Sequence, residues 1–238
     1  MSASVLYMSM SLDGYIAAPN DEPGNLGGDG FMRLHEWYGD FTAGSSGPSG
    51  EFLDEMKATG AVLAGRRTVE QVDHWGGDHH GVPVFVPSHR PPGPSVANYP
   101  LVTYVSDGIA SAMAQAKAAA GDLNVVVHGA YTAQRALEAG VLDELQIHQI
   151  PVLFGAGRRL FELLPSRVEL EIVRVIDTPE ATHIRYRVRR LVGRSSRLAE
   201  RQSLTGPVDA CRRRSTAQLR VEPCGLSREV LAFGEVGR

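Results

Sequence analysis

Residues 125–162 read VVVHGAYTAQRALEAGVLDELQIHQIPVLFGAGRRLFE, in which two apolar segments are each followed by a turn of small residues. An apolar strand over 125–127 enters a glycine turn at Gly129. A short amphipathic helix follows, and a second apolar strand over 145–150 leads to a second small-residue turn at 155–157. A strand that ends in such a turn and begins a helix leaves backbone N–H groups unpaired beyond the carboxyl edge of the sheet. Phosphate is the natural ligand of these groups, so the stretch indicates a protein that binds a nucleotide cofactor.

The same alternation of strands and helices extends along most of the chain. Further strands are predicted at 4–9, 61–63, 82–86 and 101–105, and helices at 51–58, after Gly65 with Val69 and Val72 inward, and at 109–119. Segments 168–177 and 182–188 are predicted to form a hairpin. Alternating strands and helices favour a central sheet covered on both faces, and the closing hairpin makes that sheet mixed.

The composition is that of a soluble globular protein. The 238 residues are 43% hydrophobic and 21% charged, and no apolar run approaches the roughly 20 residues that span a bilayer. The first residues have no basic start and no long apolar block, so a signal peptide is not expected. Two cysteines, Cys211 and Cys224, form neither a disulfide framework nor zinc-ligand spacing. We therefore expect a cytoplasmic protein without a metal ion.

The charge of −3 conceals two different parts. Residues 1–190 carry 15 Lys and Arg against 22 Asp and Glu, whereas residues 191–238 carry 9 Arg against 5 acids. The acidic part offers no electrostatic footprint for nucleic acid. The Arg-rich part keeps no helix or strand period and is predicted to be a disordered tail, with a tail that contacts RNA or a membrane as the alternative.

Two further turns carry phosphate-competent residues. Gly65, Arg66, Arg67 and Thr68 follow a buried strand and begin a helix. Gly65 allows close backbone approach, the two arginines offer planar guanidinium groups, and Thr68 can cap the helix or bind a phosphate oxygen. A capped helix with solvated arginines is the alternative interpretation.

The second such turn is Ser88, His89 and Arg90, which come directly after another strand. A hydroxyl, an imidazole and a guanidinium together suit a phosphate monoester, although a plain polar loop is the alternative. Arginine near the ribose favours NADP over NAD, and the chain has no G-x-G-x-x-G motif.

The glycine turn of the opening stretch continues as Gly129, Ala130, Tyr131 and Thr132, which can cradle a pyrophosphate or the nicotinamide half, or simply join a strand to a helix. After the first strand, Asp13 in SMSLDGYIA (9–17) is a turn residue or a catalytic acid.

Five ordered motifs together resemble a known family. They are SLDGYIA (11–17), AGRRTVE (64–70), SHR (88–90), VHGA (127–130) and VLDEL…PVLFGAGRRLF (141–161). The chain resembles the dihydrofolate-reductase-like superfamily over residues 4 to 190. Within it, the chain is similar to the reductase domain of the bifunctional riboflavin-biosynthesis deaminase-reductase and its stand-alone relatives.

The resemblance implies a three-layer αβα sandwich around a mixed, mostly parallel eight-stranded sheet, NADPH as the hydride donor, and a homodimer. It places Ala17 at the nicotinamide, Gly65, Arg66, Arg67 and Thr68 at the phosphates, Ser88, His89 and Arg90 at the 2′-phosphate, and Gly129, Ala130, Tyr131 and Thr132 at the pyrophosphate.

Hydride transfer must be followed by a proton, and Asp13 is the first candidate for orienting the substrate or relaying that proton. His35, Glu36 and Asp40 are second candidates, and His148 either reaches the substrate or is a buried structural residue. The expected substrate is a small planar heterocycle such as 5-amino-6-(5-phosphoribosylamino)uracil. An NADPH-binding protein without turnover, a pterin reductase and a nucleic-acid protein acting through the tail remain alternatives.

Overall fold

The computed structural model describes residues 2–38, 48–162 and 164–189. Contacts divide the chain into a first unit, Met1–Val192, and a second, Gly193–Arg238. The predicted tail, 191–238, lies outside the described residues, so its character stays a prediction. Within the described residues, none of the helices is long and apolar enough to cross a bilayer.

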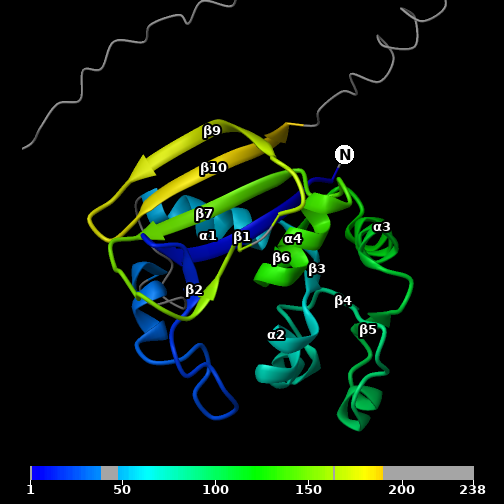
Figure 1. The fold of residues 1–238 in the computed structure, drawn as a ribbon. Helices are drawn as coiled ribbons and strands as arrows, with labels where there is room; N and C mark the ends of the chain where they lie inside the picture. Colours follow the sequence, from blue (N-terminus) through cyan, green and yellow to red (C-terminus); the bar gives the residue numbers. More distant parts are fainter. Residues whose placement is uncertain (1, 39–47, 163, 190–238) are drawn as a thin grey trace, which may run out of the picture. The chain divides into compact units, whose positions relative to one another are not determined.

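A central sheet organises the first unit (Figure 1). Its eight strands lie in the order β5-β4-β3-β6-β1-β7-β10-β9. Their bounds are β1 Ser4–Ser11, β3 Thr59–Ala64, β4 Val84–Pro87, β5 Val102–Val105, β6 Asn124–His128, β7 Glu144–Ile150, β9 Glu169–Asp177 and β10 Thr182–Arg189. The first six in this order pair in parallel, and β10 and β9 add an antiparallel hairpin at one edge. The predicted mixed, mostly parallel sheet is confirmed.

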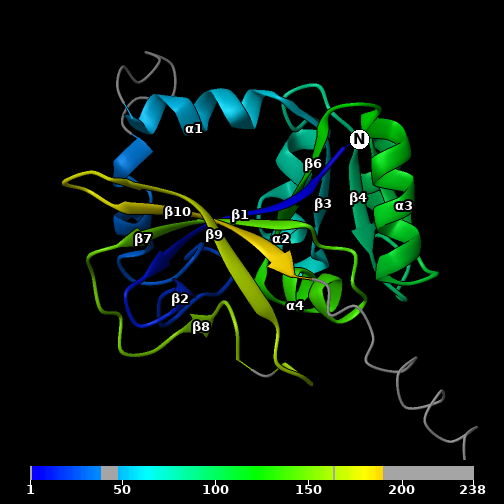
Figure 2. The ribbon, with the colours of Figure 1, turned by 90° about the horizontal axis from the view of Figure 1, so that it is seen from above.

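Helices cover both faces of this sheet. One face packs against α3 (Ile109–Ala120) and α4 (Ala130–Glu138). The other packs against α1 (Pro48–Lys57), α2 (Arg66–Gln71) and 3-10 turns at Phe31–Leu34 (η1), Glu36–Tyr38 (η2) and Asp73–Gly77 (η3). Figure 2 shows α1 and α4 on opposite sides of β1. This is the three-layer αβα sandwich that the sequence predicts.

The three valines of β6 show why the quoted stretch requires this architecture. Val125 and Val127 are buried against α3 and α4, while Val126 is buried in the core on the opposite face. A strand with no polar face is stable only where both of its faces are covered, as in parallel sheets.

The sequence analysis did not predict two short strands and several tight turns. Tyr15–Ala17 (β2) pairs with Arg158–Arg159 (β8), so the residues after the first strand do not form only a loop. These segments are too short to show a period of two, and their pairing depends on contacts distant in sequence. The helix after Gly65 is also shorter than expected, because α2 ends at Gln71. Val69 is fully buried as predicted, whereas Val72 lines a cavity.

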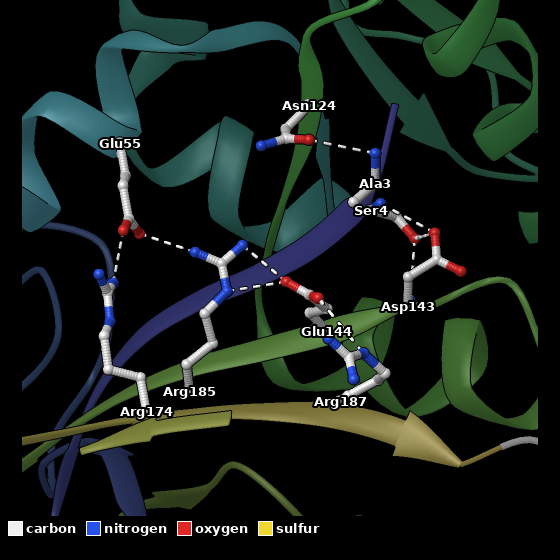
Figure 3. A network of polar contacts seen from close by, with 9 residues as sticks. All are labelled: Ala3, Ser4, Glu55, Asn124, Asp143, Glu144, Arg174, Arg185 and Arg187. Atoms are coloured by element: carbon white, nitrogen blue, oxygen red, sulfur yellow. Dashed lines mark hydrogen bonds and ion pairs between the residues drawn. The ribbon is translucent and has the colours of Figure 1, made fainter. Parts of the chain in front are cut away.

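An ionic network fastens α1 to the edge hairpin (Figure 3). Glu55 of α1 accepts hydrogen bonds from Arg174 of β9 and from Arg185 of β10, the latter at 2.7 Å. Arg185 also contacts Glu144 of β7 at 2.6 Å. The Arg185 and Glu144 side chains are only 17% and 18% exposed, so solvent and salt screen this pair less than a surface pair.

Candidate cofactor and substrate site

Two glycine turns lie side by side at the carboxyl edge of the sheet. β3 passes through Gly65 into α2, and the neighbouring parallel strand β6 passes through Gly129 into α4. The Gly65 N–H donates to the carbonyl of His128 at 3.3 Å, which holds the two turns together. The first turns of both helices therefore begin side by side.

Glycine at each of these turns leaves room for a threonine from the other helix. A Cβ on Gly65 would lie 2.7 Å from Thr132 Oγ1, and a Cβ on Gly129 would lie 2.9 Å from Thr68 Oγ1. Gly129 also has a φ of +93°, a backbone conformation that residues other than glycine rarely adopt. The reciprocal contact places both threonine hydroxyls beside the helix starts.

A cavity of about 760 Å³ lies at these turns. All twelve residues that the sequence assigns to cofactor binding line it: Ala17, Gly65, Arg66, Arg67, Thr68, Ser88, His89, Arg90, Gly129, Ala130, Tyr131 and Thr132. The structure thus brings together residues that are as far as 115 positions apart in the sequence, from Ala17 to Thr132. Their role as cofactor ligands stays a prediction.

The arginines that line the cavity differ in the number of hydrogen bonds that their side chains make within the protein. Arg66 donates to Glu70 at 2.6 Å, to Ser88 at 3.2 Å, and to the carbonyls of Arg90 and Pro91 at 3.0 and 2.8 Å. It therefore holds the loop after β4 in place. The Arg90 side chain is exposed and forms no hydrogen bond or ion pair within the described ranges, so its guanidinium is available to a ligand.

Arg67 is engaged by a residue that sequence reasoning missed. Its Nη2 donates to the carboxylate of Asp21 at 2.9 Å and to the backbone carbonyl of Asp21 at 2.6 Å. Asp21 itself lines the cavity. The only signal in the sequence was its position in a Gly- and Asp-rich segment, which does not say where the segment folds.

The rest of the lining is mainly apolar and aromatic, with two imidazoles. It includes Met8, Leu26, Phe31, His35, Val72, Trp75 and His128. Burial lowers the pKa of His128 to about 4, with a contribution from His79, and burial also lowers the pKa of His35. Both imidazoles are therefore neutral at pH 7, and a neutral imidazole has one donor and one acceptor nitrogen. The ring of His35 already hydrogen-bonds the backbone of Phe31. His35 was a second candidate from the sequence, whereas His128 was missed although it precedes Gly129.

Asp13, the predicted catalytic acid, is not among the residues that line this cavity. Its carboxylate accepts hydrogen bonds from Ser11 Oγ at 2.6 Å and from the backbone N–H of Gly155 at 2.7 Å. The Ser11 bond, ahead of the opposing effect of burial, lowers the pKa of Asp13, and the backbone bonds add to this. Asp13 joins the turn after β1 to the loop after β7. Its catalytic role stays a prediction that this geometry does not support.

The other proton-relay candidates have different positions. Glu36 is exposed, contacts Arg33 at 3.4 Å and does not line the cavity. Asp40 lies outside the described residues.

The prediction that His148 could reach the substrate is wrong, and the structural alternative is correct. His148 is fully buried, and its Nδ1 lies 2.6 Å from Nδ1 of His183. Trp37 stacks on it at 4.1 Å and donates from its indole to Ser9 at 2.9 Å. This cluster belongs to the core beneath η2. Among the described residues, no group of three or more potential ligands could hold a metal ion.

Three solved structures share the fold. A putative riboflavin biosynthesis protein from Shewanella sp. PV-4 is 24% identical with a TM-score of 0.60, covering 79% of this chain and 99% of its own. A pyrimidine reductase-like protein from Corynebacterium diphtheriae is 12% identical with a TM-score of 0.53, covering 79% of this chain and 92% of its own.

The third structure is a diaminohydroxyphosphoribosylaminopyrimidine deaminase/5-amino-6-(5-phosphoribosylamino)uracil reductase from Thermotoga maritima. It is 15% identical with a TM-score of 0.50, covering 79% of this chain and 57% of its own. Among curated proteins, none matches the chain. The model of the RibD C-terminal domain family matches residues 4–184, which is most of the chain. The chain therefore belongs to the RibD C-terminal domain family, the riboflavin-biosynthesis reductase branch that its motifs resemble.

Proposed function

We propose that this protein is a reductase that transfers a hydride from NADPH to a small planar heterocycle. The observation that carries the proposal is one cavity that joins the paired glycine turns, a basic loop and an imidazole-containing wall. The family membership supports a reductase role. That the cofactor is NADPH and that the substrate is a planar heterocycle are our proposals.

The residues present fit a dinucleotide that carries an extra phosphate. The start of α4 after Gly129, with the hydroxyls of Thr68 and Thr132 close to the two glycine turns, would hold a pyrophosphate. The exposed side chains of His89 and Arg90 would hold the 2′-phosphate, since arginine pairs with phosphate through two parallel hydrogen bonds. Ala17 would lie at the nicotinamide. When bound, the cofactor would supply a hydride to an electrophilic carbon of the substrate.

The two neutral imidazoles would orient that heterocycle. A pyrimidine presents N–H donors and carbonyl acceptors at its edge, and the neutral ring of His128 can donate one hydrogen bond and accept another. His35, whose ring hydrogen-bonds the backbone of Phe31, would add a neutral polar contact. Phe31, whose ring lies 4.5 Å from that of His35, would add an apolar contact to a planar ring. The compound for which the Thermotoga maritima relative is named, 5-amino-6-(5-phosphoribosylamino)uracil, is the first substrate to test.

One observation favours a second candidate, a protein that binds NADPH without turning it over. Asp21 supplies the one carboxylate in the lining of the cavity as far as the structure is described, and Arg67 and Gln71 already bind it. No carboxylic acid in that lining is therefore free to donate a proton. The reductase needs the proton from an imidazole or from water.

NADPH oxidation by the full-length protein separates the two candidates. The panel should contain the phosphoribosylaminouracil, a pterin and a quinone. The proposal predicts oxidation with the pyrimidine and little with the others. Tight NADPH binding with no oxidation in single-turnover measurements on any substrate would leave the binding protein as the correct interpretation.

A further inference from the structure

Residues 18–30 form a loop that closes on itself. The N–H of Ala18 donates to the carbonyl of Gly27 at 2.7 Å, and the N–H of Asp29 donates to the carbonyl of Pro19 at 2.9 Å. The Asn25 amide adds a bond to Asp29 at 2.9 Å. Because the two ends lie together and the loop bonds to itself, it has the character of a compact Ω-loop whose internal hydrogen bonds open together.

This loop has no large apolar anchor of its own. Its one leucine, Leu26, is 48% exposed. The side chain of Asp21, in contrast, is only 10% exposed. Its Oδ1 accepts from Gln71 of α2 at 2.7 Å, its Oδ2 accepts from Arg67 of α2 at 2.9 Å, and Arg158 of β8 lies 3.9 Å away. Polar contacts through Asp21 are therefore what dock the loop against α2.

The docking contact lies at the cavity. Asp21, Leu26 and Gly27 of the loop line it, and so do Arg67 and Gln71 of α2. Burial alone would raise the pKa of Asp21, but the bond from Gln71 and the charge of Arg67 outweigh it and lower the pKa. The carboxylate is therefore ionised at neutral pH, and the Asp21–Arg67 contact joins two walls of the same cavity.

We infer that Asp21 is a positioning residue that latches the 18–30 loop onto α2, and that Arg67 serves this latch instead of the 2′-phosphate of the cofactor. The carboxylate compensates the charge of Arg67, which leaves it a weaker phosphate ligand. Selection of the extra phosphate then falls to Arg90. The latch rests on the described contacts alone, whereas its effect on cofactor release rests on the proposed function.

Hydrogen exchange on the full-length protein without cofactor tests the latch itself. Undocking should remove protection from the amides bonded inside the loop, including those of Ala18, Gly27 and Asp29. Asp21→Asn and Arg67→Gln should each speed this exchange about ten-fold, since each removes a charge-assisted contact. The double variant should add little, because both changes remove the same pair of opposite charges. Glu22→Gln removes an equal charge from an exposed position of the same loop and should change nothing.

Cofactor dissociation tests the consequence. Release of NADPH and of NADH can be followed by stopped-flow through the fluorescence of Trp75, which lines the cavity. Asp21→Asn and Arg67→Gln should each raise both dissociation rates by the same factor, again without addition in the double variant. A loss confined to NADPH in Arg67→Gln, or additive effects of the two changes, would overturn the inference.

The hydrogen-exchange and cofactor-release experiments test the latch and the proposed function independently. If the unchanged protein takes up neither cofactor, the proposed function fails, and the exchange experiment still decides the latch. If Asp21→Asn does not fold, Arg67→Gln carries the exchange test, because that side chain is 52% exposed and its loss should not unfold the domain. Unchanged exchange in folded Arg67→Gln would overturn the latch.

Discussion

At the scale of single residues, identical side chains have different roles because they have different partners. Arg66 holds the loop after β4, Arg67 pairs with Asp21, and the exposed Arg90 has no hydrogen-bonding partner for its side chain within the described part of the chain. The motifs in the sequence correctly indicate which side chains line the cavity. They do not reveal these partners, which come from segments 18–30 and 88–91.

The arrangement predicts that Arg90 determines cofactor choice. Arg90→Gln should weaken NADPH binding by about 1.5–3 kcal/mol, or ten- to a hundred-fold, because a charge-assisted contact to the 2′-phosphate is lost. NADH binding should change less than about two-fold, within the usual effect of a surface substitution. Calorimetric titration of both cofactors measures the difference. Arg189→Gln, at an exposed position of β10, is the control. Equal losses for both cofactors would show that Arg90 does not contact the 2′-phosphate.

Three histidines whose pKa values are lowered by burial predict loss of stability in mild acid. Burial lowers the pKa of His148 well below 6.5, with a contribution from His183, and burial lowers the pKa of His183 and of His128 to about 4. Between pH 6.5 and about 4 these histidines bind protons in the unfolded chain but not in the folded one. The free energy of unfolding therefore decreases as the pH falls through this range. Each histidine contributes up to about 1.4 kcal/mol per pH unit.

Urea unfolding at a series of pH values without cofactor measures this effect. The free energy of unfolding should be steady above pH 7 and should decline below pH 6.5. His89→Gln, which changes an exposed histidine, should leave the slope unaltered. A free energy that stays constant between pH 7 and pH 5 would contradict the assignment of these imidazoles as neutral and buried.

At the scale of elements, long periodic segments were predictable and short or strained ones were not. The strands at 125–127 and 145–150 and the closing hairpin follow from apolar patterning. The turn of η3 does not: Asp73, His74 and Trp75 have φ values of 45°, 55° and 55°, which L-residues adopt only when tertiary contacts impose them. That turn places Trp75 in the cavity lining, so this part of the site could not be predicted from sequence patterns.

The contact of α1 with the edge hairpin predicts a specific loss of stability. Glu55→Gln should lower the free energy of unfolding by about 1–3 kcal/mol, because Arg174 and Arg185 lose the shared negative charge and one of its two acceptor oxygens. Asp54→Asn is the matched control, because its contact with Lys57 is fully at the surface and should be worth less than about 1 kcal/mol. Thermal and urea unfolding compare the two. Equal effects would mean that the network does not hold α1.

At the scale of the whole molecule, the edge hairpin has two unlike faces. Arg185, Arg187 and Arg189 alternate along one face of β10. Several aliphatic side chains of β9 are exposed, including Ile172 at 63% and Val175 at 53%. An exposed apolar edge strand is a template for association. We propose that a second copy of the chain covers this surface, in line with the homodimer that the family resemblance implies.

Light scattering after size exclusion tests that association. The protein should be a dimer, and Val175→Lys should make it a monomer because a charge would enter the apolar contact. Leu123→Lys, which changes an exposed leucine outside the hairpin, should leave the dimer intact. A protein that is monomeric before any substitution, or a Val175→Lys variant that stays dimeric, would contradict this surface assignment.

We propose that the cavity at the two glycine turns binds a dinucleotide with an extra phosphate. Isothermal titration of the folded protein with NADPH, and with NADH in parallel, measures this binding. We expect one site per chain and binding of NADPH at least about ten-fold tighter than NADH, which corresponds to one charge-assisted contact. No heat of binding with NADPH, while circular dichroism shows folded protein, would contradict it.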